Sequence, residues 1–270
     1  DRLGELIDWQ IESGTDAIVI CGTTGESTTM SDEEHVECIR YAVERTAGRV
    51  PVVAGVGSND TSYAVWLSKE AKGAGADALL HVTPYYNKTS QKGLIAHFTA
   101  VADATDLPVI LYNVPPRTGM TIAPATYLEL SKHPNIVATK EASSNVAMLA
   151  KTVSLCGDEL GVYSGCDDEI IHILAYGGHG VLSVLSNIAP RPVPDICQPW
   201  FDGKQAESAA LQLRYHDLVE ALFCDVNPIP VKAAMNTMGL NAGPCRLPLV
   251  EMSDALKESQ LACLRKHGLV

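Results

Sequence analysis

Short apolar runs alternate with helical segments along the first two-thirds of the chain, and this alternation restricts the fold more than any other feature. Seven runs have the character of buried strands, at residues 16–20, 50–54, 78–82, 109–112, 136–138, 160–165 and 180–184. Helical segments at 3–11, 31–46, 61–73, 91–104 and 124–133 precede or separate them. Such alternation builds right-handed βαβ units, so the sequence predicts a parallel sheet.

Each run ends in a loop rich in Gly, Thr, Tyr or Asn, as expected at the C-terminal face of a (β/α)8 barrel. A barrel needs eight strands, and the chain opens in a helical pattern. We therefore expect the first strand to lie upstream of Asp1, with roughly 20 further residues. An open doubly wound sheet is the alternative, but no GxGxxG follows any run to mark a dinucleotide site.

The pattern becomes wholly helical after the seventh run. Helices are predicted at about 189–200, 204–223, 229–238 and 252–267. We interpret residues 1–200 as the barrel, lacking its first strand, and residues 201–270 as a C-terminal helical appendage. Packing and subunit contacts are the roles expected of the appendage.

Composition narrows the classes of function. A net charge of -12 and a pI near 5.0 argue against a nucleic-acid-binding protein, which would need a basic stripe. The eight cysteines include no CxxC pair, which favours reduced thiols in the cytoplasm over disulfides or a zinc site. No apolar run approaches 18 residues and no signal peptide is evident, so we predict a cytoplasmic protein without membrane contact.

The run at 136–138 leads directly to Lys140. A lysine is rarely buried, and where it is, desolvation lowers its pKa and leaves an amine that can attack a carbonyl. The alternative is a surface lysine that neutralises Glu141. Strand alternation instead directs Glu141 away from the face that carries Lys140.

Polar residues follow several of the runs and would meet at one face of a barrel. They are Thr23 with Thr24, Tyr85 with Tyr86, Tyr112 with Arg117, Lys140, and Ser164 with Gly165. Each has an ordinary explanation alone: hydrogen bonding in a turn, packing of a tyrosine, or a solvated arginine. Together they suit imine formation with a 2-oxo acid, because hydroxyls can relay protons, amides of the 22–25 loop can bind one carboxylate and Arg117 another.

Other chemistries fit poorly. The eight histidines form no HxH or HExxH pattern, and no GxSxG marks a nucleophilic serine. We therefore expect neither a metal nor an organic cofactor.

The chain resembles a known family, the dihydrodipicolinate synthases. These belong to the pyruvate-dependent class I aldolases, which also include the sialic-acid lyases. The resemblance covers essentially all of residues 1–270. It rests on GTTGES (22–27), VTPYYNK (82–88), LYNVPPRTG (111–119), TKEA (139–142), SG (164–165), GGHGVLSV (177–184) and NPIPVK (227–232). NVPPRTG, which contains Arg117, is closer to the synthases than to the lyases.

The resemblance implies a reaction between pyruvate and L-aspartate 4-semialdehyde that makes 4-hydroxy-tetrahydrodipicolinate, a precursor of diaminopimelate and lysine. Lys140 would form the Schiff base. Tyr112, Thr24 and Tyr86 would relay protons, with Tyr86 supplied by a neighbouring subunit. The resemblance also implies a homotetramer built as a dimer of dimers.

Substrate contacts are implied in the same way. Thr23 and Thr24 would hold the pyruvate carboxylate, and Arg117 the carboxylate of the semialdehyde. Gly165 and Leu182 would line the pocket through their backbone. Cys166 stands where the family often has an acid, although two aspartates follow it.

Some members of the family are inhibited by lysine at a subunit interface. The corresponding positions here are Ser27, Thr28, Asp32, His35, Asn59, Tyr63 and Tyr85. Lysine-sensitive bacterial members typically carry a glutamate where Tyr63 stands, so Asp32 would have to meet the ammonium of the ligand.

Two other functions remain compatible with the sequence. One is that of another pyruvate aldolase, which would cleave a sialic acid or a 2-keto-3-deoxy sugar acid. Arg117 disfavours this function, because a polyol substrate needs no second carboxylate clamp. The other is a catalytically silent barrel that binds or assembles. The presence of Lys140, Tyr112, Thr24 and Tyr86 together argues against it.

Overall fold

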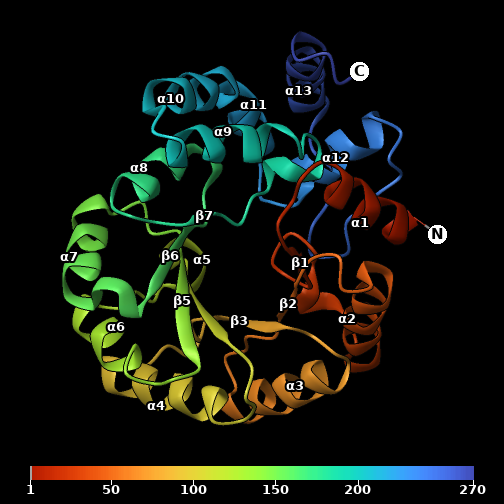
Figure 1. The fold of residues 1–270 in the computed structure, drawn as a ribbon. Coiled ribbons are helices and arrows are strands. Elements are labelled where there is room, and N and C mark those ends of the chain that lie inside the picture. The colour runs from red at the N-terminus through yellow and green to blue at the C-terminus, as the bar shows by residue number, and fades with distance from the viewer. Residues whose placement is uncertain (1) are drawn as a thin grey trace.

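The computed structural model describes residues 2–270 and contains one curled, seven-stranded parallel sheet surrounded by helices (Figure 1). Neighbouring strands follow one another in chain order, from β1 to β7. The strands are β1 (Ile18–Ile20), β2 (Val52–Gly55), β3 (Ala78–Val82), β4 (Val109–Asn113), β5 (Ile136–Glu141), β6 (Gly161–Ser164) and β7 (Gly180–Val181). The predicted α/β class, the parallel sheet and the seven strand positions are thus confirmed.

Helices α1–α9 connect or flank these strands, and α10–α13 form the C-terminal region beyond them (Figure 1). The first group is α1 (Arg2–Glu12), α2 (Asp32–Thr46), α3 (Thr61–Gly73), α4 (Gln91–Ala102), α5 (Pro115–Thr118), α6 (Pro124–Leu130), α7 (Val146–Cys156), α8 (Ile170–Ala175) and α9 (Pro192–Phe201). The second is α10 (Gln205–Arg214), α11 (His216–Leu222), α12 (Ile229–Thr237) and α13 (Asp254–Lys266). Within residues 2–270, no helix combines the length and apolarity needed to cross a membrane.

Short polar side chains fix several helix starts. The backbone N–H of Glu34 donates to Ser31 Oγ at 3.2 Å and so caps α2, and Pro124 occupies the first turn of α6. The reciprocal half of the capping box is replaced, because the Glu34 carboxylate pairs with Arg246 instead.

Alternate residues of each strand enter two different apolar layers. Val53, Leu80 and Tyr112 pack together inside the curled sheet, while their neighbours, such as Leu79 and Leu111, pack in the core against the helices. A side chain's place along a strand therefore decides whether it faces the interior or the helices.

The seventh strand is shorter than predicted, ending at Val181 rather than at 184. The backbone N–H groups of Val184 and Leu185 donate to the Asp167 carboxylate at 2.8 and 2.9 Å, which turns the chain out of the sheet. The single helix predicted at 204–223 is likewise two helices, broken at Tyr215, whose ring stacks on His267.

Three helices were not predicted: α5 after β4, α7 after β5 and α8 after β6. The helices α5 and α8 are too short for a helical period to be recognised in the sequence, whereas α7 spans 11 residues and was missed.

The C-terminal helices are present as predicted and share a core with the end of the sheet. Leu218, Leu222, Val231 and Leu264 pack against a segment that includes Leu185. The division at residue 200 stays a prediction.

Candidate active site

Lys140 lies near the end of β5, in register with Tyr112 on β4 and with Tyr163 on β6. Its Nζ is 4.4 Å from the centre of the Tyr112 ring, within cation–π distance. The side chain is half-buried inside the curled sheet, so the expectation of a buried strand-end lysine is largely met.

Burial lowers the pKa of Lys140 from 10.5 to about 8. The Arg117 charge adds to this decrease, and Asp167 and Cys166 oppose it. At pH 7 about a tenth of the amine is then neutral, compared with about one part in 3,000 for an ordinary lysine. This is the state that can attack a carbonyl carbon.

Tyr112 is buried beside this amine. Burial raises the pKa of its phenol, while the Arg117 charge and a hydrogen bond with the Thr23 side chain oppose the rise. The hydroxyl of Tyr112 is therefore protonated at neutral pH and linked to the 22–27 loop.

The 22–27 loop is a tight turn that follows β1. The N–H of Gly25 donates to the Gly22 carbonyl, and that of Glu26 donates to the Thr23 carbonyl, both at 3.1 Å. These two amides are therefore used within the turn, and an anion here would depend on the threonine hydroxyls and the remaining amides.

Asn227, between α11 and α12, is a residue of this site to which the sequence assigned no role. Its Nδ2 donates to Thr24 Oγ1 at 3.0 Å, and its backbone carbonyl accepts from Arg117 Nη2 at 3.1 Å. It belongs to the NPIPVK motif, so a signal existed. The expectation that the C-terminal region supplies only packing and subunit contacts is corrected: it also contacts two predicted site residues.

A second charged link joins the loop to the C-terminal region. Glu26 pairs with Lys232 at 2.6 Å and accepts a hydrogen bond from the backbone N–H of Arg246 at 2.7 Å. Both paired side chains are mostly shielded, with 11% of Glu26 and 16% of Lys232 exposed.

Asp167 is the buried acid of the site. Desolvation raises the pKa of its carboxyl, while hydrogen bonds from Ser183 and from the backbone beyond it, together with the Lys140 charge, oppose the rise. The sequence noted acids after Cys166 without assigning either of them. In the folded chain the Asp167 charge raises the pKa of Lys140, and the hydrogen bonds that Asp167 accepts from the backbone after β7 end that strand.

Gly165 is next to Lys140 and has no room for a side chain. A Cβ at this position would lie 2.7 Å from the Cβ of Ala142 and 3.2 Å from Cε of Lys140. Leu182 follows β7, donates its N–H to the Ser164 carbonyl at 2.8 Å and packs in the same interior cluster as Tyr112.

Glu141 points to the opposite side of β5, as strand alternation predicts. It accepts hydrogen bonds from Asn113 Nδ2 at 3.0 Å, from the Ser143 N–H at 2.8 Å and from the Tyr127 hydroxyl at 3.2 Å. The alternative in which Glu141 neutralises Lys140 is therefore wrong.

Tyr86 is not brought into this group. Its side chain is 89% exposed, its φ is +66°, and no hydrogen bond within residues 2–270 joins it to Lys140, Tyr112 or Thr24.

The residues predicted for a lysine site have partners of their own. His35 is buried with Nε2 2.8 Å from the Gly55 carbonyl, and the Asn59 carbonyl accepts from Asn87. Tyr63 donates to Asp32 at 2.7 Å. Of the remaining three, Ser27 and Thr28 lie in a short 3-10 helix (Ser27–Thr29) at the end of the 22–27 loop. The third, Tyr85, is close enough to Tyr63 to contribute to the raised pKa of its phenol.

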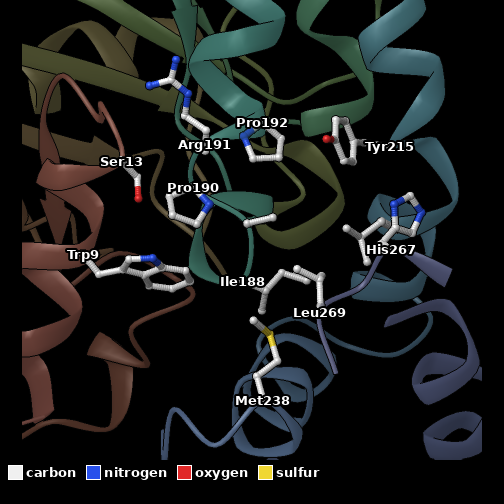
Figure 2. A pocket seen from close by; sticks show the side chains of 12 residues that line it. Trp9, Ser13, Ile188, Pro190, Arg191, Pro192, Tyr215, Met238, His267 and Leu269 are labelled. Carbon is white, nitrogen blue, oxygen red and sulfur yellow. The ribbon is translucent and has the colours of Figure 1, made fainter. Parts of the chain in front are cut away.

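Away from Lys140, a pocket lies between α1 and the C-terminal region, with Trp9, Arg191, Tyr215 and His267 in its wall (Figure 2). Of the site residues predicted above, none lines it. Among the described residues, one group, Asp217, Cys263 and His267, has spacing suited to a metal. Its Asp217 carboxylate is already paired with Lys266 and His267.

Comparison with known proteins agrees with this geometry. The chain matches the dihydrodipicolinate synthetase family over residues 1–267. It is 57% identical, over 271 residues, to the 4-hydroxy-tetrahydrodipicolinate synthase of Lachnoclostridium phytofermentans, covering 100% of this chain and 92% of that protein.

Solved structures show the same fold. A dihydrodipicolinate synthase from Acinetobacter baumannii, complexed with pyruvate, superposes with a TM-score of 0.97 at 40% identity, covering 100% of this chain and 92% of that one. The enzyme from Cyanidioschyzon merolae with lysine bound gives a TM-score of 0.97 at 39% identity, with the same coverage. The chain therefore belongs to the dihydrodipicolinate synthetase family.

Proposed function

We propose that this chain is a Schiff-base synthase that condenses pyruvate with L-aspartate 4-semialdehyde to 4-hydroxy-tetrahydrodipicolinate, a step towards diaminopimelate and lysine. The observation that carries the proposal is the half-buried Lys140, with a pKa lowered to about 8, beside the protonated Tyr112. Membership of the family and its named relatives supports the choice of reaction.

In this reaction neutral Lys140 attacks the ketone carbon of pyruvate. The carbinolamine that forms loses its oxygen as water and becomes an imine. Removal of a methyl proton gives an enamine, whose carbon adds to the aldehyde of the second substrate. The amine of that substrate then displaces Lys140 as the ring closes, which returns the free lysine.

Proton transfers in these steps fall to Tyr112 and Thr24. The hydrogen bond between Tyr112 and Thr23 supports a path from the buried amine to the loop. Thr23 and Thr24 receive the pyruvate carboxylate in this proposal, with Gly165 and Leu182 lining the pocket. No step needs a metal or an organic cofactor, because the lysine itself supplies the electron sink.

Arg117 receives the carboxylate of the semialdehyde. Its guanidinium and the Thr24 hydroxyl are both held by Asn227, so the two carboxylate sites are neighbours in this proposal. A bidentate carboxylate clamp also separates this reaction from cleavage of a sialic acid or sugar acid, whose polyol chain offers hydroxyls at this end.

We further propose that the seven strands belong to a (β/α)8 barrel of residues 1–200, followed by a helical region at 201–270.

We also propose that the enzyme works as a dimer of dimers. The exposed Tyr86, in a left-handed conformation, supports a role across a subunit interface. Tyr86→Phe should slow turnover in the assembled enzyme, and mixing it with Lys140→Ala protein should restore part of the activity if Tyr86 acts in trans.

Inhibition by lysine is the regulatory part of the proposal. Asp32 would meet the ligand ammonium, although Tyr63 already donates to it. An activity curve that stays flat in millimolar lysine refutes this part.

The reaction itself is tested by trapping. Incubation with pyruvate and borohydride should fix one reduced pyruvyl group on Lys140, detected by peptide mass spectrometry. The proposal is overturned if no adduct forms on Lys140, or if the untreated protein consumes a sialic acid but not the semialdehyde.

A further inference from the structure

Asn227 has a set of contacts that the proposed reaction does not yet use. The residue is 7% exposed, and two of its polar groups contact two different site residues. Its side-chain Nδ2 donates to Thr24 Oγ1, and its backbone carbonyl accepts from Arg117. Its Oδ1 is buried and has no hydrogen-bond partner among residues 2–270.

The direction of the side-chain bond determines where the Thr24 proton can go. A hydroxyl has one proton and two acceptor lone pairs. Since Thr24 Oγ1 accepts from Asn227, its own proton is left to donate elsewhere, to a substrate oxygen or along the relay. A residue that accepted a hydrogen bond here would take that proton away from the site.

Packing alone does not explain an asparagine at this position. A buried acceptor without a partner destabilises the fold, and an apolar side chain of similar size would avoid that loss. The amide is therefore better explained by what its N–H group does to Thr24.

We infer that Asn227 is a positioning residue that couples the two carboxylate sites. Its side chain orients the Thr24 hydroxyl on the pyruvate side, and its backbone carbonyl holds Arg117 on the side of the second substrate. This inference rests on the proposed function, because it assigns those two sides.

Asn227→Asp tests the inference, because it keeps the shape of the side chain and exchanges the donor for an acceptor. At pH 8, kcat should fall about tenfold, the effect of one hydrogen bond. In the uncharged variant Asn227→Ala, the KM for the semialdehyde should stay within about twofold, because the backbone carbonyl that holds Arg117 is retained. A structural defect alone would move both constants together.

The pH dependence supplies a second readout. Burial raises the pKa of the introduced carboxyl and the Arg117 charge lowers it. Once protonated, this carboxyl can donate to Thr24 again. The ratio of N227D to wild-type kcat should therefore rise as pH falls from 8 to 5.5, whereas the ratio for N227A should stay flat. Dividing by the wild type cancels the titration of Lys140 and Tyr112 that both proteins share.

A double-mutant cycle keeps the inference testable if N227D folds poorly. Asn227→Ala should cost about tenfold in kcat in the wild type and less than about twofold in a Thr24→Val background, because the partner has gone. Asn236→Ala is the matched control. Asn236 lies on α12, and its side-chain amide hydrogen-bonds the backbone of Gly243 rather than a site residue, so its loss should leave kcat unchanged.

Three results overturn the inference. The first is an unchanged kcat in N227D. The second is an equal rise in the KM for pyruvate and for the semialdehyde in N227A, with a matching fall in Tm, and the third is additive effects of N227A and Thr24→Val in the cycle. Failure of the proposed function is recognised separately. In that case the wild type itself shows no pyruvyl adduct on Lys140 and no turnover.

Discussion

The two sides of the site are held by different forces. Lys140 and Tyr112 sit in an apolar interior built from neighbouring strands, where desolvation sets the chemistry. The 22–27 loop lies opposite and is fixed by polar contacts from more than 200 residues away, through Asn227 and Lys232. In the proposed reaction, reactivity is thus set by the sheet, whereas the loop assigned to substrate positioning depends on contacts with the C-terminal region.

The largest effect is expected on the sheet side. Lys140→Met should lower kcat/KM by at least about 1,000-fold, since no other amine can form the imine. The same change should raise the free energy of unfolding by about 1–3 kcal/mol at pH 7, because a half-buried, partly desolvated ammonium is removed. Turnover assays and urea unfolding measure the two effects, and a variant that loses both activity and stability contradicts the assignment of Lys140 as a desolvated nucleophile.

Crowding the lysine should come next. Gly165→Ala places a Cβ against Lys140 Cε and Ala142, which must shift to make room. We expect about a 100-fold loss in the rate of pyruvyl-adduct formation and a loss of about 1–3 kcal/mol in unfolding free energy. Gly73→Ala is the control, because a Cβ at this position would have no contact within 4 Å among residues 2–270, and the glycine has no positive φ. Adduct formation at the wild-type rate in G165A means that Lys140 does not need its present position.

Breaking the C-terminal contact should change substrate binding more than reactivity. Lys232→Met leaves the shielded Glu26 carboxylate without its countercharge. We expect the KM for pyruvate to rise about tenfold and the unfolding free energy to fall by about 1–3 kcal/mol, because the Arg246 N–H that still donates to Glu26 cannot replace the ammonium charge. The pKa of Lys140, read from the pH profile of adduct formation, should stay near 8. Lys257→Met removes a largely exposed pair with Glu251 and should change neither quantity measurably.

The smallest effect is a pH dependence of stability. The pKa of Lys140 is about 8 in the folded chain and near 10.5 when unfolded. Between these values unfolding takes up a proton, so the contribution of Lys140 to stability rises with pH, and below pH 8 it is constant. The difference in unfolding free energy between wild type and K140M should therefore move by about 1–3 kcal/mol in favour of the wild type from pH 7.5 to 10. A flat difference shows that the amine is not desolvated in the folded chain.

The sequence was sufficient for the sheet side of this comparison. The position of every strand followed from its apolar run, and strand alternation correctly separated Lys140 from Glu141. These are local patterns with a fixed period, which is why they can be recognised without a structure.

The loop side could not be predicted in the same way. The sequence around Thr24 does not indicate that Asn227 is its partner, and the sequence around Glu26 does not indicate Lys232. Both pairs form only when the chain has folded. The motif around Asn227 was recognised, yet its role required distances. The early end of β7 was missed for the same reason, since it depends on Asp167, 16 residues before the Ser183 that donates to it.

The link between Asn227 and Thr24 spans 203 residues, which has a consequence for synthesis of the protein on the ribosome. At about 5–20 residues per second, roughly 10–40 s separate the emergence of Thr24 from that of Asn227. During this interval a nascent chain can already contain Lys140 on a formed sheet while the opposite wall is still open. If the proposed roles hold, the nucleophile is made before the groups that position its substrates, and the site is complete only after Asn227 has been translated.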